Sequence, residues 1–433
     1  MQVVLNYGKT GLAIDLADDW DVTVIRKRPM PILPHPEQSV LNALSDPIGC
    51  GTLREEANGR GDACIAVCDI TRPMPNRQVL PVVIRELLSS GIPAQRITVL
   101  VATGLHRPNE GDELKELIGD RWVLDTVNVV NHFAGNDGDH VYLGKTTMGI
   151  PVRLDRRFVA ADLRIVIGLV EPHFMAGYSG GRKLVAPGIA HEETIRHLHR
   201  STLLDHPHAA NCVLDGNPVH AQQLEITDMV GRILAANAVI DDCRRLSFLS
   251  FGEIKESHLA AVSFVRPYAE IPLSRRYSTV LTSAAGYPLD NTYYQTVKGM
   301  VAAMDAVISG GNLIVASACS EGMGSREYVD AQQRLMSLGL DAFDSDLKSK
   351  CLADIDEWMT QMQIKAMRTA KIFLYTDGLS DRELELTGVN RTRSIEESIR
   401  RSVEESGGSD IAVIPEGPYV VPVYAPETAG AVY

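Results

Sequence analysis

The chain has 433 residues, 45% of them hydrophobic and 6% aromatic, and its formal net charge is −13 at pH 7. This length exceeds what one hydrophobic core normally serves, so we expect two domains. The acidic balance argues against a nucleic-acid-binding protein, which needs a basic surface. No apolar run reaches the length of a membrane span, and the first residues show no secretion-signal pattern. We therefore predict a cytoplasmic protein.

Short apolar runs rich in β-branched residues alternate with helical patterns along the chain. This alternation predicts an α/β fold with two domains, in which helices cover mainly parallel sheets. The runs predicted as strands are 63–68, 97–102, 163–170, 279–284, 312–316, 371–375 and 410–414. The patterns predicted as helices include 77–89, 192–200 and 329–338.

A polar, proline-bearing stretch, residues 263–278, separates two such patterns. We therefore predict an N-terminal cofactor-binding domain at 1–275 and a C-terminal α/β domain at 276–433, with the active site in the cleft between them. The seven cysteines are odd in number and show no paired spacing, which favours a reducing compartment. Cys64 and Cys68 lie within an apolar run and are predicted to be core residues.

Polar side chains follow three of the predicted strands. Asp69 and Arg72 come after the first, His106 after the second and His173 after the third. Ligands of open parallel sheets bind beyond the carboxyl ends of the strands, so we expect these side chains to meet at one site. The planar guanidinium of Arg72 suits a carboxylate. A structural turn in which Arg72 pairs with Asp69 is the alternative interpretation.

A glycine-rich segment leads into Lys183. Ser179, Gly180 and Gly181 could form a backbone nest for an anion, and Lys183 could be a phosphate contact or a nucleophile. A tight structural turn with a solvent-facing lysine is the alternative. The segment matches neither GxxxxGK[ST] nor the dinucleotide pattern GxGxxG.

Two further pairs of residues fall on predicted helices. His197 and His199 are two apart and so do not share a helix face, which argues against one metal ion bound by both. Gln295 and Lys298 are three apart and do share a face. An amide beside an ammonium group suits a carboxylate. An ordinary amphipathic helix start is the alternative interpretation of the second pair, and without further context it is the favoured one.

Five segments in this order resemble the nickel-dependent lactate racemase family. They are DxTRP at 69–73, ATGLHR at 102–107, HFxAGYSGGRK at 173–183, TIxxxH at 194–199 and YQxxKG at 294–299. The resemblance extends from about Asp69 to Trp358. It implies a racemase or epimerase that inverts the C2 carbinol of a 2-hydroxy acid. The reaction would proceed by reversible hydride transfer to a nickel-pincer nucleotide.

The resemblance also implies roles for individual residues. Lys183 would carry the cofactor through a thioamide bond, and His199 would be the protein ligand to nickel. His106 and His173 would be the catalytic acid/base pair. The cofactor-binding set is completed by Asp69, Ser179, Gly180 and Gly181. The residues that would bind the substrate are Arg72, Tyr294, Gln295, Lys298 and Trp358.

The tail of the substrate stays open, because lactate, malate and a sugar acid such as gluconate present the same 2-hydroxy-acid head. The expected partners are this small anion and cofactor-assembling enzymes, with no nucleic acid, no membrane and an unknown oligomeric state. An NAD-dependent 2-hydroxy-acid dehydrogenase is an alternative, but its GxGxxG fingerprint is missing from the sequence. A non-catalytic nickel- or phosphate-binding protein is another, and it leaves Arg72, Gln295 and Lys298 unexplained.

Overall fold

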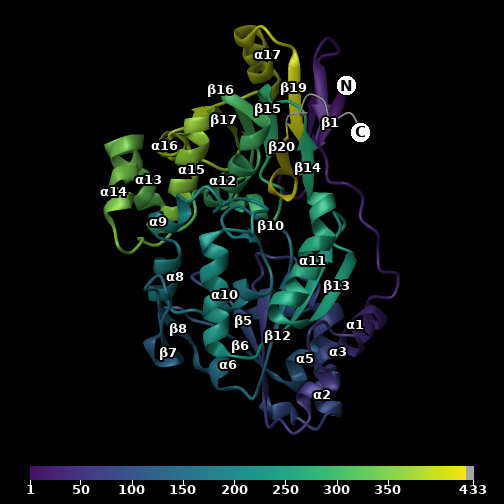
Figure 1. Cartoon of the computed structure of the whole chain (residues 1–433). Helices are drawn as coiled ribbons and strands as arrows, with labels where there is room; N and C mark the ends of the chain where they lie inside the picture. The colour runs from purple at the N-terminus through teal and green to yellow at the C-terminus, as the bar shows by residue number, and fades with distance from the viewer. Residues whose placement is uncertain (426–433) are drawn as a thin grey trace, which may run out of the picture. The chain divides into compact units, whose positions relative to one another are not determined.

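The structure is a computed structural model that describes residues 1–425, and the chain forms two compact units (Figure 1). The N-terminal unit comprises Pro29–His199 and His206–Arg266. The C-terminal unit comprises Met1–Arg28, Arg200–Asp205 and the chain from Pro267 onward. Within residues 1–425, every helix is too short or too polar to cross a membrane.

The N-terminal unit is built on a six-stranded sheet with the order β13-β12-β9-β4-β5-β6. Neighbouring strands are parallel except β12 and β13. All six residues of β4 are buried, as expected for an inner strand covered on both faces, and this confirms Cys64 and Cys68 as core residues. The strands are β4 (Ala63–Cys68), β5 (Ile97–Ala102), β6 (Asn128–Asn131), β9 (Leu163–Leu169), β12 (Leu234–Ile240) and β13 (Leu246–Glu253).

Helices connect these strands, and two small hairpins complete the unit. The predicted helix 77–89 is observed as α3, whereas the helix predicted at 192–200 ends at Leu198 and leaves His199 as its C-cap. The main helices are α1 (Pro36–Ser45), α2 (Leu53–Ala57), α3 (Asn76–Ser89), α4 (Gly111–Ile118), α5 (Arg121–Thr126), α6 (Arg156–Ala160), α7 (Arg182–Val185), α8 (Glu192–Leu198), α10 (Pro218–Val230) and α11 (Ile254–Ala269). The hairpin strands are β7 (His140–Lys145) with β8 (Pro151–Asp155), and β10 (Pro172–His173) with β11 (Gly177–Tyr178).

The C-terminal unit contains a second six-stranded sheet, which is parallel throughout and has the order β18-β17-β16-β15-β19-β3. Figure 1 shows α12 to α16 gathered next to β16 and β17. The strands are β3 (Asp21–Val24), β15 (Tyr277–Ser283), β16 (Val307–Ala316), β17 (Lys371–Tyr375), β18 (Asn390–Arg391) and β19 (Asp410–Ile414). The helices are α9 (Ser201–Leu204), α12 (Tyr293–Ala302), α13 (Arg326–Leu338), α14 (Leu340–Ser349), α15 (Glu357–Thr369), α16 (Asp381–Leu386) and α17 (Ile395–Ser406).

The first 28 residues belong to the C-terminal unit because they complete its sheet and its core. Strand β3 pairs in parallel with β19 at the sheet edge. The hairpin of β1 (Gln2–Leu5) and β2 (Leu12–Asp15) buries Leu5 and Ile14 in a cluster that includes Ile399 of α17. The sequence division at 275 places these residues in the first domain, because a strand's local pattern does not reveal which distant strand it joins.

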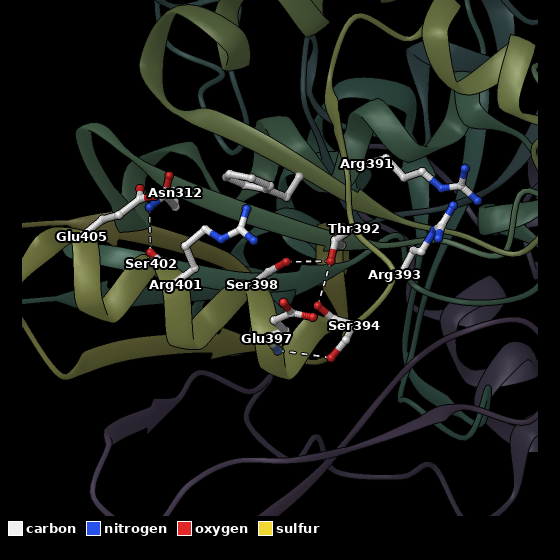
Figure 2. Close-up of a pocket in the computed structure, with 11 residues that line it drawn as sticks. Asn312, Arg391, Thr392, Arg393, Ser394, Glu397, Ser398, Arg401, Ser402 and Glu405 are labelled. Carbon is white, nitrogen blue, oxygen red and sulfur yellow. Dashed lines mark hydrogen bonds between the residues drawn. The ribbon is translucent and has the colours of Figure 1, made fainter.

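A small polar pocket of about 120 Å³ lies beside α17 in the C-terminal unit (Figure 2). Arginines 391, 393 and 401 line it, and Asn312 donates from its side-chain nitrogen to Ser402 Oγ at 2.7 Å. Its lining, taken from the described residues, includes none of the side chains predicted to carry chemistry. Those side chains are found elsewhere, as described next.

Candidate active site

Asp69 and His106 form a hydrogen-bonded pair at one edge of the N-terminal sheet. Asp69 comes directly after β4, and His106 lies in the loop after β5. The two strands are parallel neighbours with Cys68 opposite Ala102, so their carboxyl ends lie together. Asp69 Oδ2 is 2.6 Å from His106 Nδ1, and Asp69 is buried while the His106 side chain is 48% exposed.

The partner of His106 determines where its ring proton sits. An ionised carboxylate can only accept a hydrogen bond, so Nδ1 carries the proton and Nε2 keeps its lone pair. Burial alone raises the pKa of Asp69, but the charge of His106 and hydrogen bonds from His106 and Thr71 hold it below its ordinary value. Asp69 therefore stays ionised and would stabilise a protonated His106.

Arg72 is held at the same edge by Glu171. Its Nε lies 3.0 Å from Glu171 Oε1, and both side chains are largely buried. Glu171 follows β9, the neighbour of β4 on the side opposite β5. Asp69 thus pairs with His106, and Arg72 pairs with Glu171. These pairs differ from the alternative interpretation, in which Arg72 pairs with Asp69.

His173 and Lys183 form a second pair. His173 lies on the short hairpin of β10 and β11, and Lys183 lies in the first turn of α7. Lys183 Nζ is 2.8 Å from His173 Nε2. The backbone N–H groups of Met175 and Ala176 donate to His173 Nδ1 at 3.3 and 3.2 Å. The ring of His173 is thus oriented by its own loop, with Nε2 directed at the lysine amine.

Lys183 is in an environment that disfavours its charged form. Burial lowers its pKa to about 7, and the positive charges of Arg72 and Arg182 act in the same direction. Glu171 acts in the opposite direction but more weakly. These couplings also show that Lys183 lies near the Arg72–Glu171 pair, and the sequence alternative of a solvent-facing lysine is wrong.

The glycine-rich segment before Lys183 is closed by its own hydrogen bonds. Gly181 N–H donates to Asn237 Oδ1 at 3.0 Å, and Ser179 bonds carbonyl groups around the end of β9. Gly180 has a φ of +78°, and a Cβ there would lie 2.5 Å from a valine side chain. The segment therefore holds Lys183 in place, and its predicted contact with a cofactor stays a prediction.

Arg182 anchors this segment from within the core. It is 1% exposed, and it donates to the carbonyl oxygens of Ala176 and Tyr178 at 2.8 and 2.9 Å. Its Nη1 lies 2.7 Å from His258 Nε2, and it forms no ion pair within the described part of the chain. Burial lowers the pKa of Arg182 to about 9. A buried guanidinium thus lies beside Lys183 and opposes a second positive charge.

His199 presents the nitrogen that a metal ligand needs. Its Nδ1 is 2.8 Å from the carbonyl oxygen of Ile195, which can only accept, so Nδ1 is protonated and Nε2 has the lone pair. The pKa of His199 is lowered to about 4, mainly by burial and further by the charge of nearby Lys183. The ring is therefore neutral at pH 7. Among the described residues no three His, Cys, Asp or Glu side chains gather as a metal site. A metal ion at His199 would take its other ligands from elsewhere.

The remaining candidates lie in the C-terminal unit. Gln295 and Lys298 are both on α12, which confirms the predicted helix, and Gln295 Oε1 is buried without a hydrogen-bond partner among the described residues. Trp358, on α15, is 5% exposed and donates from Nε1 to Tyr294 OH at 3.0 Å. The structure brings Tyr294 and Trp358 together, while the role of these four residues in substrate binding stays a prediction.

Sequence reasoning missed three residues that support the site. Glu171 directly follows a predicted strand, so its place at this edge of the sheet could have been predicted, although its pairing with Arg72 could not. Asn237 and His258 come from β12 and α11, for which no element was predicted. No local pattern marks them, because their function is to satisfy a loop that is distant in the sequence.

Comparison with known proteins assigns both parts of the chain. The family described as lactate racemase N-terminal domain matches residues 7–211, and the lactate racemase C-terminal domain matches residues 274–422. The lactate racemase of Thermoanaerobacterium thermosaccharolyticum is 30% identical over 434 residues, 97% of this chain and 98% of that protein. The lactate racemase of Lactiplantibacillus plantarum is 28% identical over 389 residues, 88% of this chain and 89% of that protein.

Solved structures show the same relation. The lactate racemase apoprotein from T. thermosaccharolyticum matches with a TM-score of 0.91 and 28% identity, and the match covers 98% of this chain and 100% of that one. A protein from Thermotoga maritima matches with a TM-score of 0.68 over 90% of this chain and 98% of that one. At 17% identity, the second match shows a common fold alone.

The fold and these matches define an enzyme of the isomerase class, a racemase. The chain belongs to the lactate racemase family. The resemblance carried by its sequence motifs is thereby confirmed, as is the α/β fold with two mainly parallel sheets.

Proposed function

We propose that this racemase inverts the C2 carbinol of a 2-hydroxy acid, with lactate as the first candidate because both curated relatives are lactate racemases. The observation that carries the proposal is the grouping of two histidines, each with a defined partner, with Arg72 and Lys183 around the carboxyl ends of β4, β5 and β9. Such a group can bind a carboxylate and exchange a hydroxyl proton.

His106 is suited to remove the hydroxyl proton of the substrate. Its Nε2 has a lone pair, and the Asp69 carboxylate on Nδ1 stabilises the imidazolium that forms. The half-exposed ring is open to a bound substrate, whereas the carboxylate is largely buried and holds the ring. We assign Asp69 as the positioning residue of His106, in addition to the cofactor contact that the family resemblance implies.

His173 is the second histidine of the proposed acid/base pair. Inversion exchanges the two faces of C2, so the hydroxyl group of each isomer points in a different direction. One histidine for each orientation is the minimal arrangement that serves both isomers. Because His173 Nδ1 accepts from two backbone N–H groups, we assign the ring proton to Nε2, so that His173 would donate toward an oxygen whereas His106 would accept.

The residues fit the nickel-pincer nucleotide on two observations. Lys183 has an amine with a lowered pKa, as covalent attachment needs, and His199 has an unprotonated Nε2 directed away from its helix carbonyl. We propose that Lys183 holds the cofactor, which the assembling enzymes supply, and that His199 binds its nickel. When bound, the cofactor supplies the hydride acceptor and donor, and the protein supplies position and electrostatics.

The substrate carboxylate is proposed to bind Arg72, Gln295 and Lys298. Glu171 orients the guanidinium of Arg72. The amide N–H group of Gln295 is the part that would bind the carboxylate, and its buried amide oxygen, which has no partner among the described residues, would accept from the substrate hydroxyl. Tyr294 and Trp358, joined by their hydrogen bond, are proposed to contact the same ligand. Malate and gluconate stay candidate substrates because these groups recognise only the 2-hydroxy-acid head.

A panel of single-isomer 2-hydroxy acids tests the proposal. The protein is produced together with the cofactor-assembling enzymes, an adduct on Lys183 is verified by mass spectrometry, and lactate, malate and gluconate are followed by NMR or polarimetry. Inversion at C2 of lactate is the expected result. Absence of turnover across the panel by protein that carries the adduct would contradict the proposed reaction.

A further inference from the structure

We propose that His173 prepares Lys183 for attachment of the cofactor: in the unmodified chain it donates its Nε2 proton to Lys183 Nζ and holds the amine as an uncharged nucleophile. The inference rests on the proposed function, which makes Lys183 the attachment site. It gives His173 a role that precedes its proposed part in proton exchange.

The direction of the hydrogen bond follows from the backbone. The N–H groups of Met175 and Ala176 both point at His173 Nδ1, and a backbone N–H can only donate. Nδ1 is therefore unprotonated, and a neutral imidazole must then carry its proton on Nε2. The atom 2.8 Å from Nε2 is Lys183 Nζ, so this nitrogen must accept. An ammonium group has no lone pair and cannot accept, whereas a free amine can.

The surroundings of Lys183 support the same state. Arg182 is buried beside it without a carboxylate, and Arg72 is also near, so a third positive charge is disfavoured. Glu171 already pairs with Arg72 and only partly offsets these charges. The charged or titratable groups around the amine are Arg72, Arg182, Glu171, Cys68, His173 and His199.

Attachment would also release His173. In attachment the Lys183 lone pair would attack a carboxyl or thiocarboxyl carbon, the N–C bond would form, and the bond from that carbon to its hydroxyl or thiol group would break, so that this group leaves with an amine proton as water or hydrogen sulfide. Once Lys183 Nζ is part of this amide-type bond, its lone pair is delocalised into the carbonyl or thiocarbonyl group. The nitrogen then keeps one N–H donor but can no longer accept from His173 Nε2. The histidine loses its lysine partner at the step at which the site gains its cofactor, and it becomes available to a substrate oxygen.

The test uses acylation of the unmodified protein, which does not depend on racemase activity. In each event the Lys183 lone pair attacks a carbonyl carbon of acetic anhydride, an N–C bond forms, acetate leaves with the bonding electrons, and the nitrogen proton passes to solvent. Mass spectrometry of limited labelling at pH 7 measures Lys183 against the exposed Lys145 of the same unit. Two variants of similar shape, His173→Gln and His173→Glu, are compared with the wild type.

The two variants differ in what they offer the amine. Glutamine retains an N–H donor, so Lys183 labelling in His173→Gln is expected to stay within about threefold of the wild type. Glutamate places a carboxylate that favours the ammonium form, so labelling in His173→Glu is expected to fall about tenfold or more. The melting temperature reports whether each variant is folded, and labelling of the exposed Lys145 corrects for the amount of reagent. Equal labelling of Lys183 in two folded variants would overturn the inference.

The failure of this inference is distinguishable from failure of the proposed function. Wild-type protein produced with the cofactor-assembling enzymes is examined for an adduct on Lys183. Adduct formation together with equal labelling of the two variants contradicts only the role of His173. Absence of the adduct contradicts attachment at Lys183, and with it the inference, whatever the labelling shows.

Discussion

His106 and His173 are the same residue type in one unit, but their partners place the ring proton on opposite nitrogens. His106 donates from Nδ1 to a buried carboxylate, which leaves the lone pair on Nε2. His173 accepts at Nδ1 from two backbone N–H groups, which places its ring proton on Nε2, opposite the amine of Lys183. Two histidines can therefore act as acid and base in one site because their hydrogen-bond partners, and not the rings themselves, determine which nitrogen carries the proton.

Replacing Lys183, the hydrogen-bond partner of His173, is expected to have the largest effect on racemisation. Lys183→Met has no amine for attachment, so the cofactor is not retained and racemisation should fall by about 10⁴-fold or more, because the hydride chemistry belongs to the cofactor. Intact-mass measurement of protein made with the assembling enzymes checks this. Lys145→Met is the matched control and should retain both adduct and activity. An adduct of unchanged mass on Lys183→Met would refute the assignment.

Replacing the other histidine separates proton exchange from attachment. His106→Gln should lower racemisation in both directions by about 10²–10⁴-fold, the range of general acid–base catalysis. It should still carry the adduct, because the hydrogen bond of His106 is to Asp69 whereas that of Lys183 is to His173. Initial rates from each lactate isomer measure the loss. Near wild-type rates from either isomer would show that His106 is not part of the pair.

The carboxylate partner of His106 is expected to matter somewhat less. In Asp69→Asn an amide N–H can face Nδ1 and favour a proton on Nε2, the wrong tautomer for a base, so the rate should fall by about 10²-fold. Substrate KM should change little, since Asp69 is buried behind the ring. Asp112→Asn, at an exposed position of the same unit, is the control. A loss confined to KM would argue that Asp69 contacts ligand instead.

The pH dependence of Lys183 acylation sharpens the comparison without altering a residue. A pKa of about 7 leaves half of the amine uncharged at pH 7, whereas an ordinary lysine at about 10.4 is almost fully protonated. Labelling of Lys183 should therefore rise about tenfold between pH 6 and pH 8 and then level off. Labelling of Lys145 should keep rising beyond pH 9. Parallel profiles for the two lysines would contradict the lowered pKa.

A change outside both pairs should have the smallest effect. Trp358→Phe loses the hydrogen bond to Tyr294 OH but keeps most of the aromatic volume, so KM should rise about two- to tenfold with kcat little altered. Steady-state kinetics with lactate measures this. Unchanged KM would remove Trp358 from the proposed substrate contacts.

Much of this arrangement could be predicted from the sequence, and the remainder has a physical reason. Strand ends could be predicted because buried runs such as 63–68 are local, and the polar residues that follow them lie at one edge by the rule of parallel sheets. The partner of Arg72 could not be predicted. Glu171 and Arg72 meet because β4 and β9 are neighbours in the sheet, and the sequence does not show which strands are neighbours. The ring proton of His173 depends on backbone N–H directions that the sequence does not specify.

Inversion at C2 by hydride transfer should retain the hydrogen that is transferred. Lactate with deuterium at C2 is incubated with protein that carries the adduct on Lys183, and the isotope content of each isomer is followed by NMR and mass spectrometry. We predict that the opposite isomer appears with its C2 deuterium retained. Inversion with rapid loss of deuterium to solvent would indicate proton abstraction at C2 and would contradict the account.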